Sequence, residues 1–168
     1  LRSLVGSEMC IRDRLKKARM ATDFLAGVDA GFAAIGQRTT PQVVPAPGNA
    51  PLVIDLELVS HEQMERNVVV TDMVSRARLE WQQELFQLRE RLLTVCPPFA
   101  EDENPMDPGR FTAAFTAAAE VFDVDLDILK ILYKQFDRAV LLHLDEVYTP
   151  ANQRMKDAGL LPNLTPLS

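Results

Sequence analysis

The chain contains few of the residues that carry most protein chemistry: of its 168 residues, two are cysteine and two are histidine. Two cysteines exclude a framework of several disulfides and are typical of a reducing compartment. No apolar run reaches the roughly 18 to 20 residues needed to cross a bilayer, and the first residues lack the order of a secretory signal peptide. Acidic residues outnumber basic ones by 24 to 18, which argues against a nucleic-acid surface. We expect a cytoplasmic protein that contacts neither membrane nor nucleic acid.

Motifs that bind phosphate, nucleotides or metals are also missing. No GxxxxGK, GxGxxG or GxSxG pattern occurs, so a phosphate loop, a dinucleotide turn and a hydrolase elbow lack support. Asp123, Asp125 and Asp127 open like a calcium loop, but Ile128 and Lys134 stand where that loop needs glycine and a bidentate glutamate. We interpret these acids as favourable charges at a helix N-terminus and predict no cofactor and no metal.

The first fourteen residues differ from the rest, whose hydrophobic and charged content is that of an ordinary soluble domain. Residues 4–13, Leu-Val-Gly-Ser-Glu-Met-Cys-Ile-Arg-Asp, resemble one reading frame of a transposase-type sequencing adapter. Such read-through contaminates assembled metagenomic sequence. We therefore interpret residues 1–14 as a non-native segment, the alternative being the start of a native amphipathic helix.

The chain before residue 60 is predicted to contain one helix, a linker and an extended arm. In residues 15–37 the apolar side chains recur at helical spacing, which predicts an amphipathic helix that ends near Gly36. Four prolines between residues 38 and 51 predict an extended linker. Apolar and acidic residues alternate in residues 52–59, which is the pattern of a half-buried strand. This strand-like arm either packs across helices or pairs outside the chain.

Residues 60–95 are predicted to form one long helix. Ser60 and Gln63 have the form of a capping box, and a break near Thr71 is an alternative because three stiff valines precede it. Two apolar stripes run along this helix, so it should touch two neighbours. The broader stripe consists of Val74, Ala77, Trp81, Leu85, Leu88, Leu92 and Val95, and the narrower one of Leu79, Phe86 and Leu93. The arginines at 76, 78, 89 and 91 alternate with acids and are interpreted as a solvated face.

Residues 107–160 are predicted to contain the remaining helices. Asp107 as N-cap and Pro108 at the first helical position begin a short helix, whose alanines permit close helix packing. A longer helix should run from Asp125 or Asp127 to about Tyr148. Thr149 as cap and Pro150 as first residue should then begin a final helix, which Gly159 ends. We therefore predict an all-α fold, an irregular bundle of about four to five helices, with one extended or strand-like arm near residues 52–59. Residues 52–160 form the helical domain, and residues 161–168 a loop tail.

Two of these helices carry more apolar surface than packing against one neighbour would bury, which favours a protein interface. The predicted interaction faces are the narrow stripe Leu79, Phe86 and Leu93 and the arc centred on Leu132, Phe136 and Val140. His143 lies on the apolar face of the long predicted helix. We interpret it as a core or boundary residue, with a pH-sensitive switch as the alternative. Cys96 continues an apolar stripe, which indicates packing rather than catalysis.

Separated blocks of residues 56–164 resemble the N-terminal part of a proteobacterial family known as domain-of-unknown-function family 1631. The blocks are LELVSHEQ from residue 56, DMVSRAR from 72, ELF from 84, NPM from 104, ILYKQFDR from 131, NQR from 152 and GLLPNL from 159. The resemblance implies a largely helical cytoplasmic protein without an established activity. Some members are labelled thymidine phosphorylase, and no motif in this chain supports that label.

Members of this family are several times longer than this chain, so the resemblance implies that the chain is a fragment. The helices carry large apolar faces and the sequence carries no recognisable catalytic motif. This combination favours a scaffold or protein-interaction segment of a larger bacterial protein. Its partner would be the remainder of the parent chain, another helical protein or a second copy in a homo-oligomer. The alternative is part of an enzyme whose active site lies mainly outside this segment, with His143, Asp137 or Tyr133 contributing.

Overall fold

Six α-helices and three 3₁₀ helices make up the part of the chain that the computed structural model describes, residues 2–36 and 61–164. The α-helices are α1 (Arg2–Gly36), α2 (His61–Glu80), α3 (Gln82–Leu92), α4 (Pro108–Ala119), α5 (Leu126–Ala139) and α6 (Asp145–Asp157). The 3₁₀ helices are η1 (Glu101–Glu103), η2 (Glu120–Phe122) and η3 (Leu141–His143). These ranges contain no strand, and the predicted all-α bundle is confirmed. The predicted linker at 38–51 and the arm at 52–59 lie outside the described residues.

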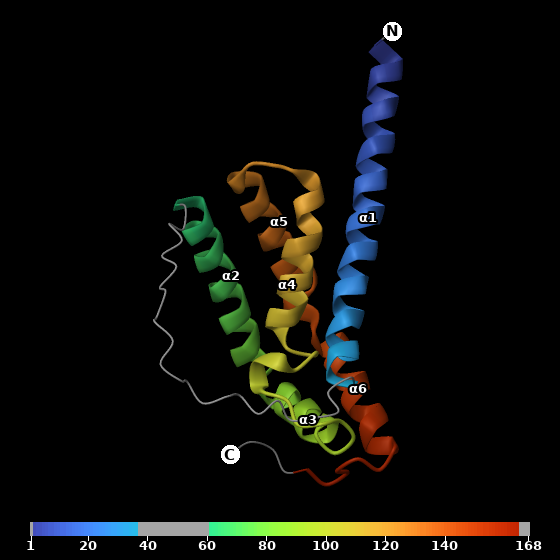
Figure 1. The fold of residues 1–168 in the computed structure, drawn as a ribbon, viewed down its shortest axis with the longest axis vertical. Coiled ribbons are helices and arrows are strands. Elements are labelled where there is room, and N and C mark those ends of the chain that lie inside the picture. Colours follow the sequence, from blue (N-terminus) through green and yellow to red (C-terminus); the bar gives the residue numbers. More distant parts are fainter. Residues whose placement is uncertain (1, 37–60, 165–168) are drawn as a thin grey trace, which may run out of the picture.

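The helices pack in pairs around one core (Figure 1). α1 lies along α4 on one side of the bundle, and α2 packs against α5 on the other. α3 crosses one end of the bundle and packs against α6. The N-terminal part of α1 extends beyond the other helices, so the predicted helix of residues 15–37 is the C-terminal part of a longer one.

The centre of the core is aromatic. Phe115 of α4 stacks on Phe136 of α5, with ring centroids 4.1 Å apart, and Phe24 of α1 meets Phe136 edge-on at 6.0 Å. Tyr133 of α5 packs edge-on against Phe115. Offset and edge-on ring pairs add stabilisation to the burial of the rings themselves. Three helices that are distant in sequence therefore share one aromatic cluster.

α1 approaches α4 most closely at Gly27. A Cβ atom built at Gly27 would lie 2.9 Å from the Cβ of Ala114, which is closer than two carbon atoms can pack. Glycine on one helix and alanine on the other therefore allow this spacing. The predicted role of the α4 alanines in close helix packing is confirmed here.

The predicted helix of residues 60–95 is broken at Trp81, which separates α2 from α3. Trp81 has φ −105° and ψ 20°, and its indole Nε1 donates a hydrogen bond of 2.8 Å to the carbonyl oxygen of Leu141. The alternative break near Thr71 is wrong, because α2 is continuous there. The helix also ends at Leu92 rather than near Val95, and Val95 is exposed. The break therefore coincides with a tertiary contact of the Trp81 indole. The stiff valines before Thr71 do not predict its position.

The predicted helix from Asp125 to Tyr148 is broken at Val140, where φ is −122° and ψ is −60°. α6 begins at Asp145, so the predicted restart at Thr149 and Pro150 is wrong, and Pro150 lies inside α6. Gly159 follows the end of α6 with φ 82°, as predicted for a glycine that terminates a helix.

Candidate functional site

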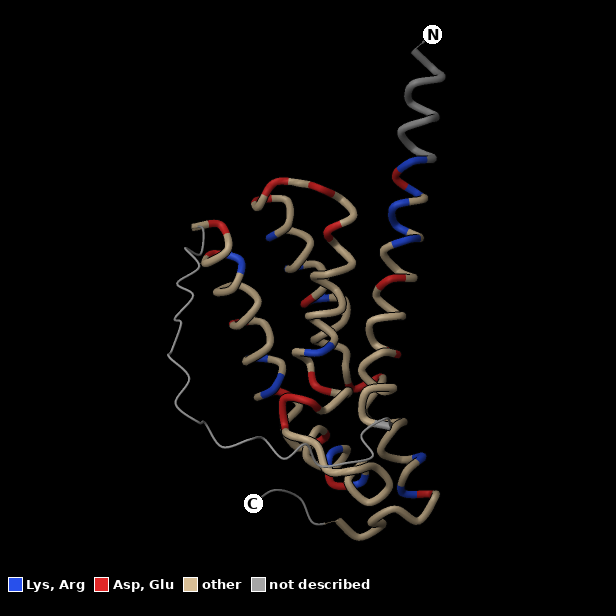
Figure 2. Tube along the Cα trace, viewed as in Figure 1, with Lys and Arg blue, Asp and Glu red and all other residues tan. Residues whose placement is uncertain are grey.

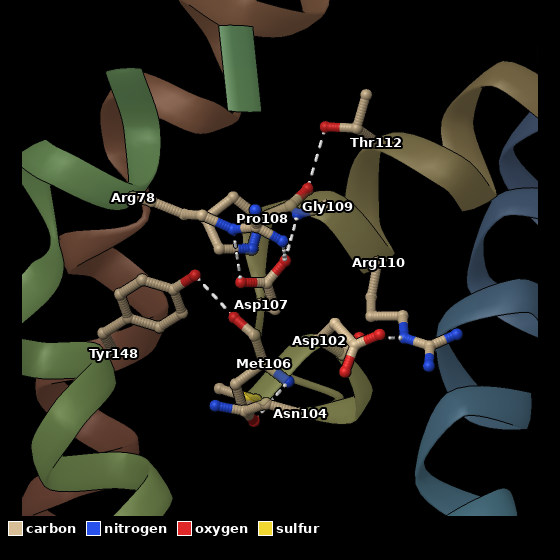
Figure 3. Close-up of polar contacts among 10 residues, drawn as sticks. All are labelled: Arg78, Asp102, Asn104, Met106, Asp107, Pro108, Gly109, Arg110, Thr112 and Tyr148. Carbon is tan, nitrogen blue, oxygen red and sulfur yellow. Dashed lines mark hydrogen bonds and ion pairs between the residues drawn. The ribbon is translucent and has the colours of Figure 1, made fainter. Parts of the chain in front are cut away.

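Asp107 is the centre of a polar cluster that joins α2 to α4 (Figure 3). As predicted, it caps α4: its Oδ1 accepts a hydrogen bond of 2.7 Å from the N–H of Gly109. Arg78 of α2 donates to both carboxylate oxygens, at 2.9 Å from Nε and 2.8 Å from Nη2. This bidentate hydrogen bonding raises the pKa of Arg78. The buried carboxylate therefore holds two helices together.

Tyr148 connects α6 to the same cluster (Figure 3). Its hydroxyl donates a hydrogen bond of 2.6 Å to the carbonyl oxygen of Met106, and the Oδ1 of Asn104 accepts one of 3.0 Å from the N–H of Met106. Burial raises the pKa of the Tyr148 hydroxyl, and the charge of Asp107 raises it further. Because these groups are engaged with one another, we assign the cluster a structural role.

Arg91 organises a second polar cluster, between α3 and α6. It is 4% exposed and donates hydrogen bonds to the Oδ1 of Asn152 and, at 3.2 Å, to the carbonyl oxygen of Leu160. The Nδ2 of Asn152 in turn donates to the carbonyl oxygen of Glu84 at 3.2 Å. The interpretation of Arg91 as part of a solvated face is wrong, because this contact buries its guanidinium against the segment that follows α6.

Two ion pairs lie along the contact between α2 and α5. Glu65 pairs with Lys130, and Arg76 pairs with Asp137 at 3.2 Å. The hydrogen bond to Lys130 is the main cause that lowers the pKa of Glu65, and the same bond raises the pKa of Lys130. Asp137 is thus engaged in a helix–helix contact.

The predicted arc on α5 belongs to the core. Phe136 is buried, and Leu132 and Val140 pack against the core cluster. η3, which follows the break at Val140, packs against α5. An interaction role for this arc stays a prediction. His143 follows the same break and is exposed, so its interpretation as a core or boundary residue is wrong.

The second predicted stripe is divided by the break at Trp81. Phe86 borders a hollow of about 390 Å³ beside the Asp107 cluster, and Leu93 packs against the core. Leu79 is 71% exposed at the end of α2. It borders a different hollow, of about 440 Å³, together with Leu142, which is 52% exposed. We call this feature the Leu79–Leu142 hollow.

The Leu79–Leu142 hollow has an apolar centre and a charged rim. Leu79 and Leu142 flank it, and Ala77 and Leu141 are buried between α2 and η3. Its remaining lining residues are Arg76, Glu80 and Asp137. An apolar centre within a polar rim is the anatomy of a protein–protein interface. Of the six predicted interface residues, Leu79 is the one that the structure places in such a surface.

A further hollow, of about 210 Å³, lies where α2, α4 and α5 meet. Tyr133 of α5 and Arg66 of α2 line it together with Thr116 of α4. Burial raises the pKa of the Tyr133 hydroxyl. Sequence reasoning named Tyr133 as an enzyme candidate and missed Arg66, because the spacing along α2 does not show which helix packs on it.

The histidine, cysteine, aspartate and glutamate side chains of the described residues form no group of three that could hold a metal ion. Cys96 is a free thiol that packs against the core, as predicted. Figure 2 shows acidic and basic residues interspersed along most described helices. None of the helices among residues 2–36 and 61–164 meets the length and apolarity needed to cross a membrane.

Comparison with known proteins identifies the family. Residues 10–159 match the family described as "Protein of unknown function (DUF1631) N-terminal domain". The chain belongs to the DUF1631 family. This match confirms the resemblance carried by the separated sequence blocks, and three of those blocks supply Asn104, Tyr133 and Asn152. No curated protein and no solved structure matches the chain. The adapter origin of residues 1–14 stays a prediction.

Proposed function

We propose that this DUF1631 domain is a helical interaction module, a scaffold segment that binds an amphipathic helix in the Leu79–Leu142 hollow. The observation that carries the proposal is the exposure of Leu79, the most exposed large hydrophobic side chain of the described residues. A leucine in this position adds nothing to the core, whereas a partner helix would cover it and gain its hydrophobic burial.

The outer face of α2 extends this surface. Val68 and Met64 are 69% and 57% exposed, and both lie on the helix face of Leu79 at 100° per residue. The opposite face carries the buried Met73 and Ala77. α2 therefore resembles a helix that packs on two neighbours. A cytoplasmic location is part of this proposal and rests on the low cysteine content.

A second copy of the chain is the partner that can be tested first, because two copies would bring the outer faces of two α2 helices together. Analytical ultracentrifugation of the 168-residue chain over a hundredfold concentration range should show association. Leu79→Glu should abolish it and leave helix content intact, because the leucine is exposed. Val95→Glu is the matched control, since Val95 is exposed in the turn that follows α3 and lies outside the hollow.

Two results would contradict the proposal. One is a strictly monomeric chain that binds no hydrophobic dye. The other is equal association of the Leu79→Glu and Val95→Glu variants, which would place the contact elsewhere.

A further inference from the structure

Two adjoining hollows form a trench where the beginning of α2 faces the end of α4 and the beginning of α5. The inner hollow, of about 210 Å³, is the one lined by Tyr133. The outer hollow measures about 550 Å³ and opens beside Glu62 of α2 and Leu126 of α5. Arg66, Val124 and Leu129 line both, so the two hollows are continuous.

The inner end of the trench carries hydrogen-bond donors that have no partner among the residues that the structure describes. Tyr133 is 1% exposed, and its hydroxyl makes no hydrogen bond with any residue that the structure describes. The guanidinium of Arg66 likewise has no hydrogen bond or ion pair among residues 12–35 and 61–164. A tyrosine hydroxyl can donate one hydrogen bond, and an arginine offers donors only. The inner end therefore matches a hydrogen-bond acceptor, and an anionic one best.

Carboxylates surround the rest of the trench. Glu120 and Asp123 border the inner hollow, and Glu62, Asp125 and Asp127 border the outer one. Five acids against one arginine oppose a multiply charged anion such as phosphate and attract an amino group. Val124 and Leu129 provide an apolar strip that both hollows share.

We propose that the trench binds a small amino-carboxylate, whose carboxylate accepts hydrogen bonds from Arg66 and Tyr133 and whose ammonium group lies among the acids. The hydrocarbon part of such a molecule contacts Val124 and Leu129. This site is separate from the Leu79–Leu142 hollow, and it does not depend on the interaction proposed there.

L-lysine and two of its fragments test the proposal on the 168-residue chain. Cadaverine is lysine without the carboxylate, and hexanoate is lysine without both amino groups. Titrations followed by ¹⁵N–¹H NMR should show lysine shifting the amide signals of Arg66, Thr116 and Tyr133. Both fragments should bind at least about tenfold more weakly, because a hydrogen bond or ion pair to a charged group changes affinity by this factor or more.

Two tyrosine variants distinguish an effect on lysine binding from an effect on the stability of the fold. Tyr133→Phe should weaken lysine binding by about tenfold and leave the thermal midpoint unchanged, because the lost hydroxyl has no partner within the described protein. Tyr148→Phe should lower the midpoint and leave lysine affinity unchanged wherever the chain is folded. The proposal is wrong if lysine fails to bind. It is also wrong if cadaverine or hexanoate binds as well as lysine, or if Tyr133→Phe binds lysine like the unaltered chain.

Discussion

The two tyrosines of this chain should respond oppositely to removal of their hydroxyl groups. Tyr148 has no exposed surface, and its hydroxyl donates to the carbonyl oxygen of Met106, which is itself buried. Tyr148→Phe leaves that carbonyl without this donor, at a cost of about 1 to 3 kcal/mol. Tyr133→Phe removes a hydroxyl that has no hydrogen bond among the described residues, so the free energy of unfolding should change by less than about 0.5 kcal/mol.

Urea denaturation measures the free energy of unfolding of both variants. Thermal denaturation gives a second measurement: each kcal/mol corresponds to about 2 to 4 °C in the thermal midpoint for a chain of this length, so the Tyr148 variant should melt at least about 2 °C lower. Circular dichroism and the fluorescence of Trp81, whose ring lies 6.5 Å from that of Tyr148, should report the same transition if unfolding is two-state. Equal destabilisation by the two substitutions would refute the assignment of the paired and the unpaired hydroxyl.

Three further predictions follow from burial and packing. Desolvation raises the pKa of both Tyr133 and Tyr148, so folding favours their protonated forms. Their contribution to stability should be constant below the unfolded pKa of about 10 and fall above it, and urea denaturation from pH 8 to 11 should show a smaller loss for Tyr148→Phe. Gly27→Ala should lower the thermal midpoint because its Cβ would lie 2.9 Å from Ala114, whereas Gly31→Ala, with 3.9 Å of room, should raise stability by about 0.5 to 1 kcal/mol; the reverse order would contradict the α1–α4 spacing. Deleting residues 1–14 should change the free energy of unfolding by less than about 0.5 kcal/mol, since Met20 is the first residue of α1 with a described side chain that packs against the core; a larger loss in calorimetry would show that the segment packs.

Much of the fold could be predicted because it depends on neighbours in sequence. The cap at Asp107, the proline that follows it and the glycine after α6 act within a few residues, so their residue types predict their roles. The apolar face of residues 15–37 likewise follows from helical spacing alone. These local signals are sufficient to predict an all-α bundle.

The tertiary structure decided where the long helices break and which polar groups are buried. Trp81 and Val140 interrupt predicted continuous helices, and these breaks bring Leu79 beside Leu142 and carry His143 out to solvent. Helical periodicity does not reveal such breaks, because the residues on either side keep good helix propensity. Arg91 and Asp107 find their partners far along the chain, through contacts that no local pattern encodes. The sequence by itself determined most of the helices and their apolar faces. Packing decided which of these faces are buried inside the protein. It also left the Tyr133 hydroxyl without a partner among the described residues, because its surroundings depend on how three helices meet in space.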